Sequence, residues 1–252
     1  MRRVTDTAPD FRKYFDAVEG PHDSHNPIGT DKLAQVRDLL TPADGDRLLD
    51  VGCGAGYFLH DLASRHAVDA TGIDISPYAL DRARARGAAS PGRVRWELQD
   101  LRDSEPPADA YDVVSCLGAT MALGDYPAAI GWLARAVRPG GRVAVGEVFR
   151  DPASGDYPAD SMAGRPLLLS ELVERAADAG LDPVGIVQAD QDDWDRYQTA
   201  QWQTTRRWLA AHPDDPDAPA IEELSGTFRD RYLRVDRPHL RWVVLILVRR
   251  TG

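Results

Sequence analysis

Cysteine is scarce in this chain of 252 residues, which contains only Cys53 and Cys116. Two cysteines exclude a disulfide framework and a cysteine metal cluster. Histidine, aspartate and glutamate are not arranged at the spacing of metal ligands either, so we expect no metal site. Because structural disulfides belong to oxidising compartments, this sparing use of cysteine favours a cytoplasmic location.

Long apolar runs and an excess of positive charge are missing as well. No uncharged run reaches the ~18 residues of a membrane-spanning helix, and the first residues lack the apolar core of a secretion signal. We therefore expect no membrane partner and no secretion. The 40 acidic residues outnumber the 30 basic ones, which gives a net charge of -10. A nucleic-acid binder needs a basic surface to neutralise phosphates, so we expect no nucleic-acid partner.

The most informative stretch that is present runs from residue 48 to residue 56. It reads Leu-Leu-Asp-Val-Gly-Cys-Gly-Ala-Gly, the end of a buried strand followed by three alternate glycines. Glycine lets the backbone turn sharply and approach a ligand closely. The next residues share one helical face at Phe58, Leu59, Leu62 and Ala63, so the glycines join a strand to a helix N-terminus. This arrangement is typical of nucleotide sites.

The rest of the chain alternates strands with helices. Further strands are predicted at 68–74, 93–99, 111–117, 142–149, 183–188 and 240–248. Helices are predicted at 30–40, 57–63, 77–86 and 170–179, with a further one carrying Ile130, Leu133 and Val137. The strand at 93–99 alternates polar with apolar residues and is expected near the sheet edge. The pattern predicts an α/β fold with a doubly wound, mostly parallel sheet covered on both faces.

Polar or reactive residues gather at the carboxyl ends of these strands, where sheets of this kind bind ligands. They are Asp50, Asp74, Asp100, Cys116 and Glu147. Asp74 follows Gly52 by 22 residues, close to the ~20 residues at which an acid accepts hydrogen bonds from ribose hydroxyls. The pattern therefore predicts a ligand with a ribose at this edge of the sheet.

Two segments lie outside the alternating pattern. Residues 1–28 are expected to form a lid segment, with a short amphipathic helix that carries Phe11, Tyr14, Phe15 and Val18 and a loop at 20–27. Residues 190–238 are too long for a hairpin turn and are expected to form an insertion of two helices packed over the sheet edge. We expect one domain over residues 1–252.

Taken in chain order, several stretches resemble the successive motifs of the class I S-adenosylmethionine-dependent methyltransferases. They are Leu48 to Gly56, Asp74, Asp100, Tyr111 to Thr120 and Val137 to Val143. The resemblance covers roughly residues 30 to 190 and the last strand. It implies a seven-stranded Rossmann-like sheet with an antiparallel last strand, and S-adenosylmethionine as cofactor. A nicotinamide fingerprint would need glycine at position 57, where this chain has Tyr57.

The resemblance also implies cofactor contacts, residue by residue. The loop under the methionine portion matches Asp50, Gly52, Cys53, Gly54 and Gly56. The ribose acid matches Asp74, and the surroundings of the adenine match Ile75, Asp100 and Leu101. The strand end near the sulfonium matches Cys116 and Leu117.

Methyl transfer from a sulfonium asks the protein for positioning, desolvation and in some cases a base. We take Glu147, at a strand end, and His25, in the N-terminal loop, as catalytic candidates. His22 and His239 are weaker candidates for the base. The loop at 20–27 that carries His22 and His25 can also be interpreted as a solvated turn. Tyr14, His22, Trp194 and Tyr197 are the substrate-binding candidates, although tryptophans at helical spacing also occur in cores.

The sequence therefore predicts a methyltransferase that acts on a small organic molecule at oxygen, nitrogen or sulfur. Methylation of a protein or RNA, and a cofactor-binding partner protein without activity, are the alternatives. The basic run Arg82, Arg84 and Arg86 is expected to be a solvated helix face. Whether the protein forms a homodimer is left open.

Overall fold

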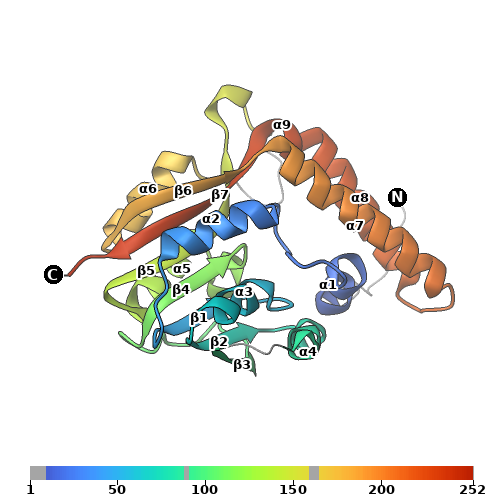
Figure 1. The fold of residues 1–252 in the computed structure, drawn as a ribbon. Helices are drawn as coiled ribbons and strands as arrows, with labels where there is room; N and C mark the ends of the chain where they lie inside the picture. The colour runs from blue at the N-terminus through green and yellow to red at the C-terminus, as the bar shows by residue number, and fades with distance from the viewer. Residues whose placement is uncertain (1–9, 88–90, 159–164, 252) are drawn as a thin grey trace.

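The computed structural model describes residues 10–87, 91–158 and 165–251, so the first nine residues of the predicted lid segment lie outside the described residues. Seven strands form one sheet in the order β3-β2-β1-β4-β5-β7-β6 (Figure 1). Their bounds are β1 Arg47–Val51, β2 Asp69–Asp74, β3 Arg93–Leu98, β4 Tyr111–Leu117, β5 Val137–Arg150, β6 Leu181–Ala189 and β7 Leu240–Arg249. β7 runs antiparallel to both β5 and β6, and the neighbouring pairs from β3 to β5 are parallel. The predicted mostly parallel sheet with an antiparallel last strand is confirmed.

Helices cover both faces of the sheet. On one face lie α2 (Thr30–Leu40) and α3 (Tyr57–Arg65), with α4 (Pro77–Arg86) beside β2 and β3. On the other face lie α5 (Tyr126–Ala136) and α6 (Leu169–Asp178). Each face has its own apolar cluster, because successive strand side chains point to opposite faces.

Local sequence signals account for most element ends. Ser76 caps α4 by accepting from the backbone N–H of Ala79, with Pro77 in the first turn. β3 alternates exposed with half-buried residues and lies at the sheet edge, as predicted. The expected end of α5 is wrong by one residue, because Val137 is already extended and pairs with Tyr111 of β4.

The insertion does not lie over the sheet edge as predicted. Its helices α7 (Gln191–Ala211) and α8 (Ala218–Arg231) extend away from the sheet and pack against α1 (Phe11–Glu19), as Figure 1 shows. A π-helical turn, η3 (Tyr232–Asp236), and the short α9 (Arg237–His239) return the chain to β7. Short 3-10 turns also occur at η1 (Thr120–Leu123) and η2 (Pro152–Ser154). Of the helices within the described residues, none combines the length and apolar composition needed to span a bilayer.

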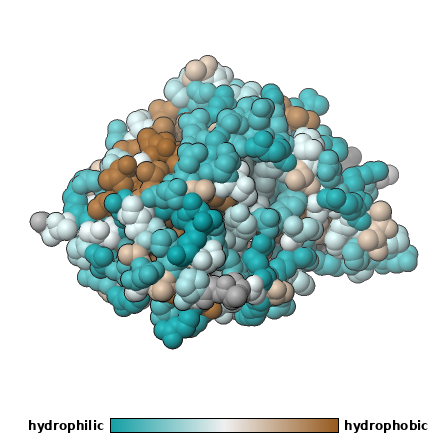
Figure 2. Space-filling view, in the orientation of Figure 1, coloured by the Kyte–Doolittle hydropathy of each residue, from teal (hydrophilic) through white to brown (hydrophobic). Residues whose placement is uncertain are grey.

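Most of the visible surface is hydrophilic, with one apolar area on the side where β6 and β7 lie (Figure 2). The edge strand β6 contributes Val184 and Ile186, which are both about half exposed. The turn at Ala43–Asp46 precedes β1, so the carboxyl ends of the parallel strands lie at the opposite end of the sheet from this turn. Helix α1 packs against α4 beside these carboxyl ends. This end of the sheet holds the site.

Candidate active site

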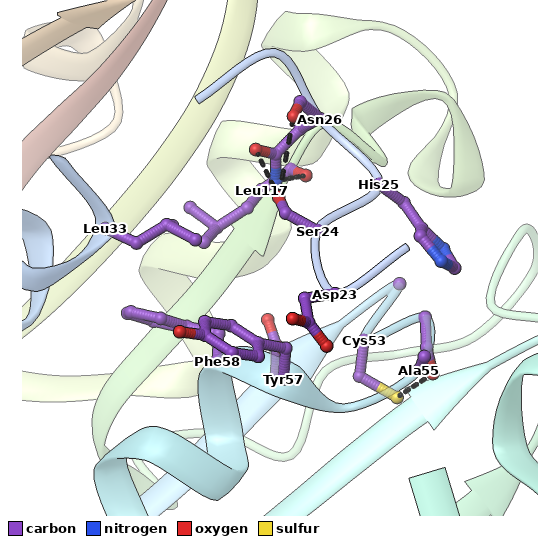
Figure 3. A pocket seen from close by; sticks show the side chains of 13 residues that line it. Asp23, Ser24, His25, Asn26, Leu33, Cys53, Ala55, Tyr57, Phe58 and Leu117 are labelled. Atoms are coloured by element: carbon purple, nitrogen blue, oxygen red, sulfur yellow. Dashed lines mark hydrogen bonds between the residues drawn. The ribbon is translucent and has the colours of Figure 1, made fainter. Parts of the chain in front are cut away.

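A partly enclosed hollow lies between the glycine turn after β1 and the loop at residues 20–29 (Figure 3). It contains about 400 Å³ of empty space, part of it open to solvent. Its lining residues are Asp23, Ser24, His25, Asn26, Leu33, Asp50, Gly52, Cys53, Gly54, Ala55, Tyr57, Phe58 and Leu117. The glycine turn and the N-terminal loop, part of the expected lid segment, therefore line one pocket.

The glycines of the turn are required by backbone geometry and by close neighbours. Gly52 and Gly54 have φ angles of 68° and 51°, in the left-handed region that favours glycine. A side chain at Gly52 would place its Cβ 2.2 Å from the Cβ of Ala119, and one at Gly54 would lie 2.9 Å from Nδ1 of His25. The turn is therefore packed tightly between the loop after β4 and the lid.

Asp74 at the end of β2 is held by the backbone around it. Its Oδ2 accepts from the N–H of Gly54 and its Oδ1 from the N–H of Ser76, both at 2.8 Å. A carboxylate offers about four acceptor positions, so Asp74 can still accept from a further donor. Burial raises its pKa, which the backbone hydrogen bonds oppose.

Asp50 at the end of β1 is buried more deeply. Its carboxylate accepts from Oγ of Ser115, its register partner on β4, at 2.7 Å. Burial raises the pKa of Asp50 to about 7, and the nearby carboxylate of Asp74 contributes in the same direction. A cationic partner would stabilise the ionised form of this buried carboxyl group, so Asp50 is suited to bind a cation.

Apolar side chains stand exposed at the ends of β2 and β3. Ile75 is 45% exposed and Leu98 is 58% exposed, whereas Leu101 is buried. Asp100 lies in the open, where Arg102 donates to both of its oxygens and holds its pKa below the usual range. This arrangement offers a flat ring an apolar surface with a polar group beside it.

The described part of the lid segment, residues 10–28, is tied down by charge. Arg86 of α4 donates to Asp23 at 2.8 Å and to the carbonyl of Ala55 at 3.2 Å. Arg82 donates to Asp16 of α1 at 2.8 Å. All three arginines of the predicted solvated face are exposed. Arg82 and Arg86 also pair with the lid segment, whereas Arg84 pairs with Asp81 of its own helix.

The family is decided by comparison with known proteins. Residues 48–141 match the family model of a methyltransferase domain. The chain is 34% identical to the uncharacterised protein YjhP of Escherichia coli over 248 residues, which are 96% of this chain and 100% of YjhP. The chain belongs to the class I S-adenosylmethionine-dependent methyltransferases.

Two methyltransferases are also similar to this chain, one of them with a solved structure. The crystal structure of one from Geobacter sulfurreducens, in complex with S-adenosyl-L-homocysteine, is 34% identical and has a TM-score of 0.83, covering 94% of this chain and 98% of that chain. The 27-O-demethylrifamycin SV methyltransferase of Amycolatopsis mediterranei is 33% identical over 183 residues, 69% of this chain and 64% of that protein. This methyltransferase therefore uses S-adenosylmethionine as its cofactor.

The structure brings most of the predicted cofactor residues to the pocket or beside it. Asp50, Gly52, Cys53, Gly54 and Leu117 line the pocket. Burial raises the pKa values of the thiols of Cys53 and Cys116, so both are kept as thiols. Cys116 points to the opposite face of the sheet from Leu117 and belongs to the apolar cluster under α5.

Glu147, the first catalytic candidate, is not among the pocket-lining residues. It lies within β5, which continues beyond the predicted strand end to Arg150, and it pairs with Val243 of β7. Strand alternation places it on the same face as Val145, toward α5. Its carboxylate accepts from Oγ1 of Thr120 at 2.5 Å and from the N–H of Val148 at 2.9 Å. Burial raises its pKa, and these two hydrogen bonds oppose the rise.

His25, the second candidate, lies in the pocket. Its ring extends over the loop that holds Cys53 and Ala55 (Figure 3). Its Nδ1 is 4.0 Å from Oε2 of Glu19, and its buried Nε2 has no hydrogen-bond partner within the described residues. Burial lowers the pKa of His25 to about 4, so the ring is neutral near pH 7.

The four substrate-binding candidates are not brought together at the pocket. Tyr14 of α1 is buried against Phe228 of α8, and Trp194 is buried against Tyr232. Nε2 of His22 lies 2.9 Å from Oγ1 of Thr204, on α7. Tyr197 reaches the back of the histidine loop, where its hydroxyl donates to Glu19 and lies 3.2 Å from the carbonyl of His25.

Sequence reasoning missed several residues of the site. Asn26 donates to the carbonyl of Leu117 at 3.3 Å and so fastens the lid to the end of β4. Trp242 of β7 does not line the pocket but lies just behind it, where a Cβ added at Gly146 would be 2.5 Å from its ring and one added at Gly118 would be 3.9 Å away. The inward alternation of β7 could have indicated Trp242, whereas no local pattern indicates the contact of Asn26.

Proposed function

We propose that this methyltransferase acts on a small organic molecule. The observation that carries the proposal is the lid segment, which covers the glycine turn and is fastened to β4 through Asn26 and to α4 through Asp23. A pocket enclosed on several sides suits a small ligand, whereas a protein or RNA strand needs an open groove. The net charge of -10 also disfavours RNA.

The residues present fit S-adenosylmethionine. Asp74 can still accept from a further donor beyond those of the backbone, as a ribose hydroxyl requires. Asp50 is a buried acid that a cationic ammonium group would stabilise. Ile75 and Leu98 offer exposed apolar surface to an adenine ring. We therefore assign the cofactor contacts to these residues and to the backbone of the glycine turn.

The chemistry divides between the cofactor and the chain. The cofactor supplies an electrophilic methyl group bound to a sulfonium. The chain holds the acceptor in line, excludes water beneath the lid and accepts a proton where the acceptor carries one. His25 lines the pocket as a neutral ring and is the side chain that we assign to proton transfer. Glu147 stays a candidate for contact with the acceptor from the other face of the sheet.

The proposal is tested by following labelled methyl groups. The full-length enzyme and labelled S-adenosylmethionine are incubated with three separate acceptor pools: a small-molecule extract, total RNA and heat-denatured protein. We expect label in the small-molecule pool, and less of it when Asp74→Ala replaces the wild type at a limiting concentration of labelled S-adenosylmethionine. Label confined to RNA or protein would contradict the proposal. Tight binding of S-adenosylhomocysteine without label in any pool would contradict it in favour of a binding protein without activity.

A further inference from the structure

A carboxylate that pairs with no lysine or arginine of the described residues is buried behind the pocket. Glu19, the last residue of α1, is 5% exposed. Its Oε1 accepts two hydrogen bonds from α7, one from the hydroxyl of Tyr197 and one from Nε2 of Gln201. Burying an acid costs free energy that two neutral donors only partly offset. Such acids gather at functional sites, because their pKa values are shifted into the working range.

The other oxygen of this carboxylate faces His25. Oε2 of Glu19 is 4.0 Å from Nδ1 of His25, and the ring edge beyond carries Nε2, which has no hydrogen-bond partner in the part of the chain that the structure describes. An imidazole that faces a carboxylate through Nδ1 places its proton there and leaves Nε2 as an acceptor. The tautomer is inferred from these neighbours. The hydroxyl of Tyr197 fixes the pair, because it contacts both the Glu19 carboxylate and the backbone carbonyl of His25.

We propose that Glu19 is the positioning residue for His25, and that the pair takes the proton of a weakly acidic hydroxyl on the methyl acceptor. This inference rests on the proposed function and deepens it by naming the class of acceptor. Glu19 acts through His25 and contacts neither substrate nor cofactor. Tyr197, expected from the sequence to bind substrate, instead holds this pair in place.

The proton balance is simple. The acceptor O–H gives its proton to Nε2 of His25 as an oxygen lone pair forms the new O–C bond. The electron pair of the broken S–C bond stays on sulfur, which becomes a neutral thioether. His25 becomes an imidazolium, and Glu19 as a carboxylate stabilises that charge through Nδ1. One positive charge thus passes from the sulfonium to the imidazole, and no further reactant is needed.

The hydroxyl class follows from ordinary acidities. An amine that reacts as its free base has a lone pair before any proton is removed. A thiol, with a pKa of ~8.5, is already partly ionised near neutral pH, whereas a phenolic hydroxyl at ~10 is not. A buried base therefore matters most for a phenol or an enol.

The charged groups around the pair define its titration. Several titratable groups lie around the ring of His25: Glu19 on α1, Tyr197 on α7, Arg82 and Arg86 on α4, and His22 in the same loop as His25. Tyr14 also lies close to Glu19. Burial raises the pKa of Glu19 to about 7 and lowers that of His25 to about 4, where His22 and the two arginines also act. Near pH 7 the ring of His25 is therefore neutral, and the carboxyl group of Glu19 is about half ionised.

The test follows the imidazole nitrogens of His25 by NMR in the full-length protein saturated with S-adenosylhomocysteine, from pH 5 to pH 8.5. In the wild type we expect a step near pH 7, when Glu19 ionises beside the ring. Glu19→Gln keeps an oxygen for Tyr197 and Gln201 and changes the atom that faces Nδ1. The step near pH 7 disappears in this variant if the inference is right. Identical titration curves in the two proteins overturn it.

Activity gives a second, independent readout. With a phenolic acceptor found in the labelling experiment, we expect Glu19→Gln to lower kcat about 10- to 100-fold with little change in KM. Glu19→Asp should restore part of kcat, which a purely structural defect would not allow. Asp236→Asn is the matched control, because Asp236 is another acid whose pKa burial raises, and it pairs with Arg231 away from the pocket.

The two proposals fail in different ways. If label reaches only RNA or protein, the proposed function is refuted, and so is the proposed role of the Glu19–His25 pair. If small molecules are methylated and Glu19→Gln titrates like the wild type, only the role of Glu19 is refuted. Should Glu19→Gln fold poorly, Tyr197→Phe removes the shared hydroxyl instead and is expected to lower kcat without abolishing binding of S-adenosylhomocysteine. Full kcat in Tyr197→Phe would also count against the inference.

Discussion

The buried acid at the end of β1 makes cofactor affinity depend on pH. Burial raises the pKa of Asp50 to about 7, so this side chain is mostly neutral at pH 6 and mostly ionised at pH 7.5. A cationic ammonium binds the ionised form, so affinity rises with pH through this window. The ionised fraction changes from roughly one tenth to three quarters, which corresponds to an affinity change of about eightfold, or ~1.2 kcal/mol.

Calorimetric titration with S-adenosylhomocysteine measures this effect directly. The wild type should bind about eightfold more weakly at pH 6 than at pH 7.5 and should release a proton on binding at pH 6. In Asp50→Asn the amide oxygen can still accept from Ser115, but the charge is lost. We expect this variant to bind ~2–3 kcal/mol more weakly at pH 7.5, as for loss of a charged hydrogen bond, and without pH dependence. An unchanged pH slope in Asp50→Asn would refute the assignment of Asp50.

Thermal stability provides the control. The folded-state pKa of Asp50 lies above its ordinary value, so its contribution to stability is present at low pH and is lost as pH rises through about 7. Without ligand, Asp50→Asn should therefore be more stable than the wild type at pH 8, by up to ~4 kcal/mol, and should lose this advantage near pH 4. Lower stability of the variant at both pH values would mean that its weak binding reflects misfolding.

Three further predictions concern neighbouring residues. Asp74→Ala should weaken binding of S-adenosylhomocysteine by ~1–3 kcal/mol, because charge-assisted hydrogen bonds to the ribose are lost; unchanged affinity by calorimetry would remove Asp74 from the site. Glu147→Gln should leave that affinity unchanged and reduce turnover, and wild-type turnover would exclude Glu147 from the mechanism. Arg86→Gln should speed limited proteolysis within residues 20–29 by up to about fivefold, since the ion pair with Asp23 contributes ~1 kcal/mol or less. Arg84→Gln, on the same helix, should not, and equal rates for both variants would contradict a tethering role.

Several elements of this protein could be predicted from local sequence because their causes are local. The glycine turn needs left-handed backbone at Gly52 and Gly54, and the strand before it is buried on both faces. Period-two and helical apolar patterns predicted the strands, including the edge position of β3, whereas the antiparallel direction of β7 was implied by the family resemblance. These features depend on a few consecutive residues and on general rules of chain geometry.

The direction of a side chain within a strand could also have been inferred. Val143 and Val145 of β5 face the cluster under α5, so alternation puts Glu147 on that face as well. The lid contacts Leu117, whose side chain belongs to the other face. Glu147 was predicted from its position at a strand end, and alternation adds that it lies across the sheet from His25.

The sequence by itself determined the sheet, the glycine turn and the acids at the strand ends, because each follows from periodicity or from a backbone conformation. Only the tertiary structure decided what surrounds the acceptor. Asp23 meets Arg86, and Glu19 meets Tyr197, across 63 and 178 residues, and no local period records such a pairing. The insertion helices could equally have covered the sheet edge; packing against α1 brought them behind the histidine loop.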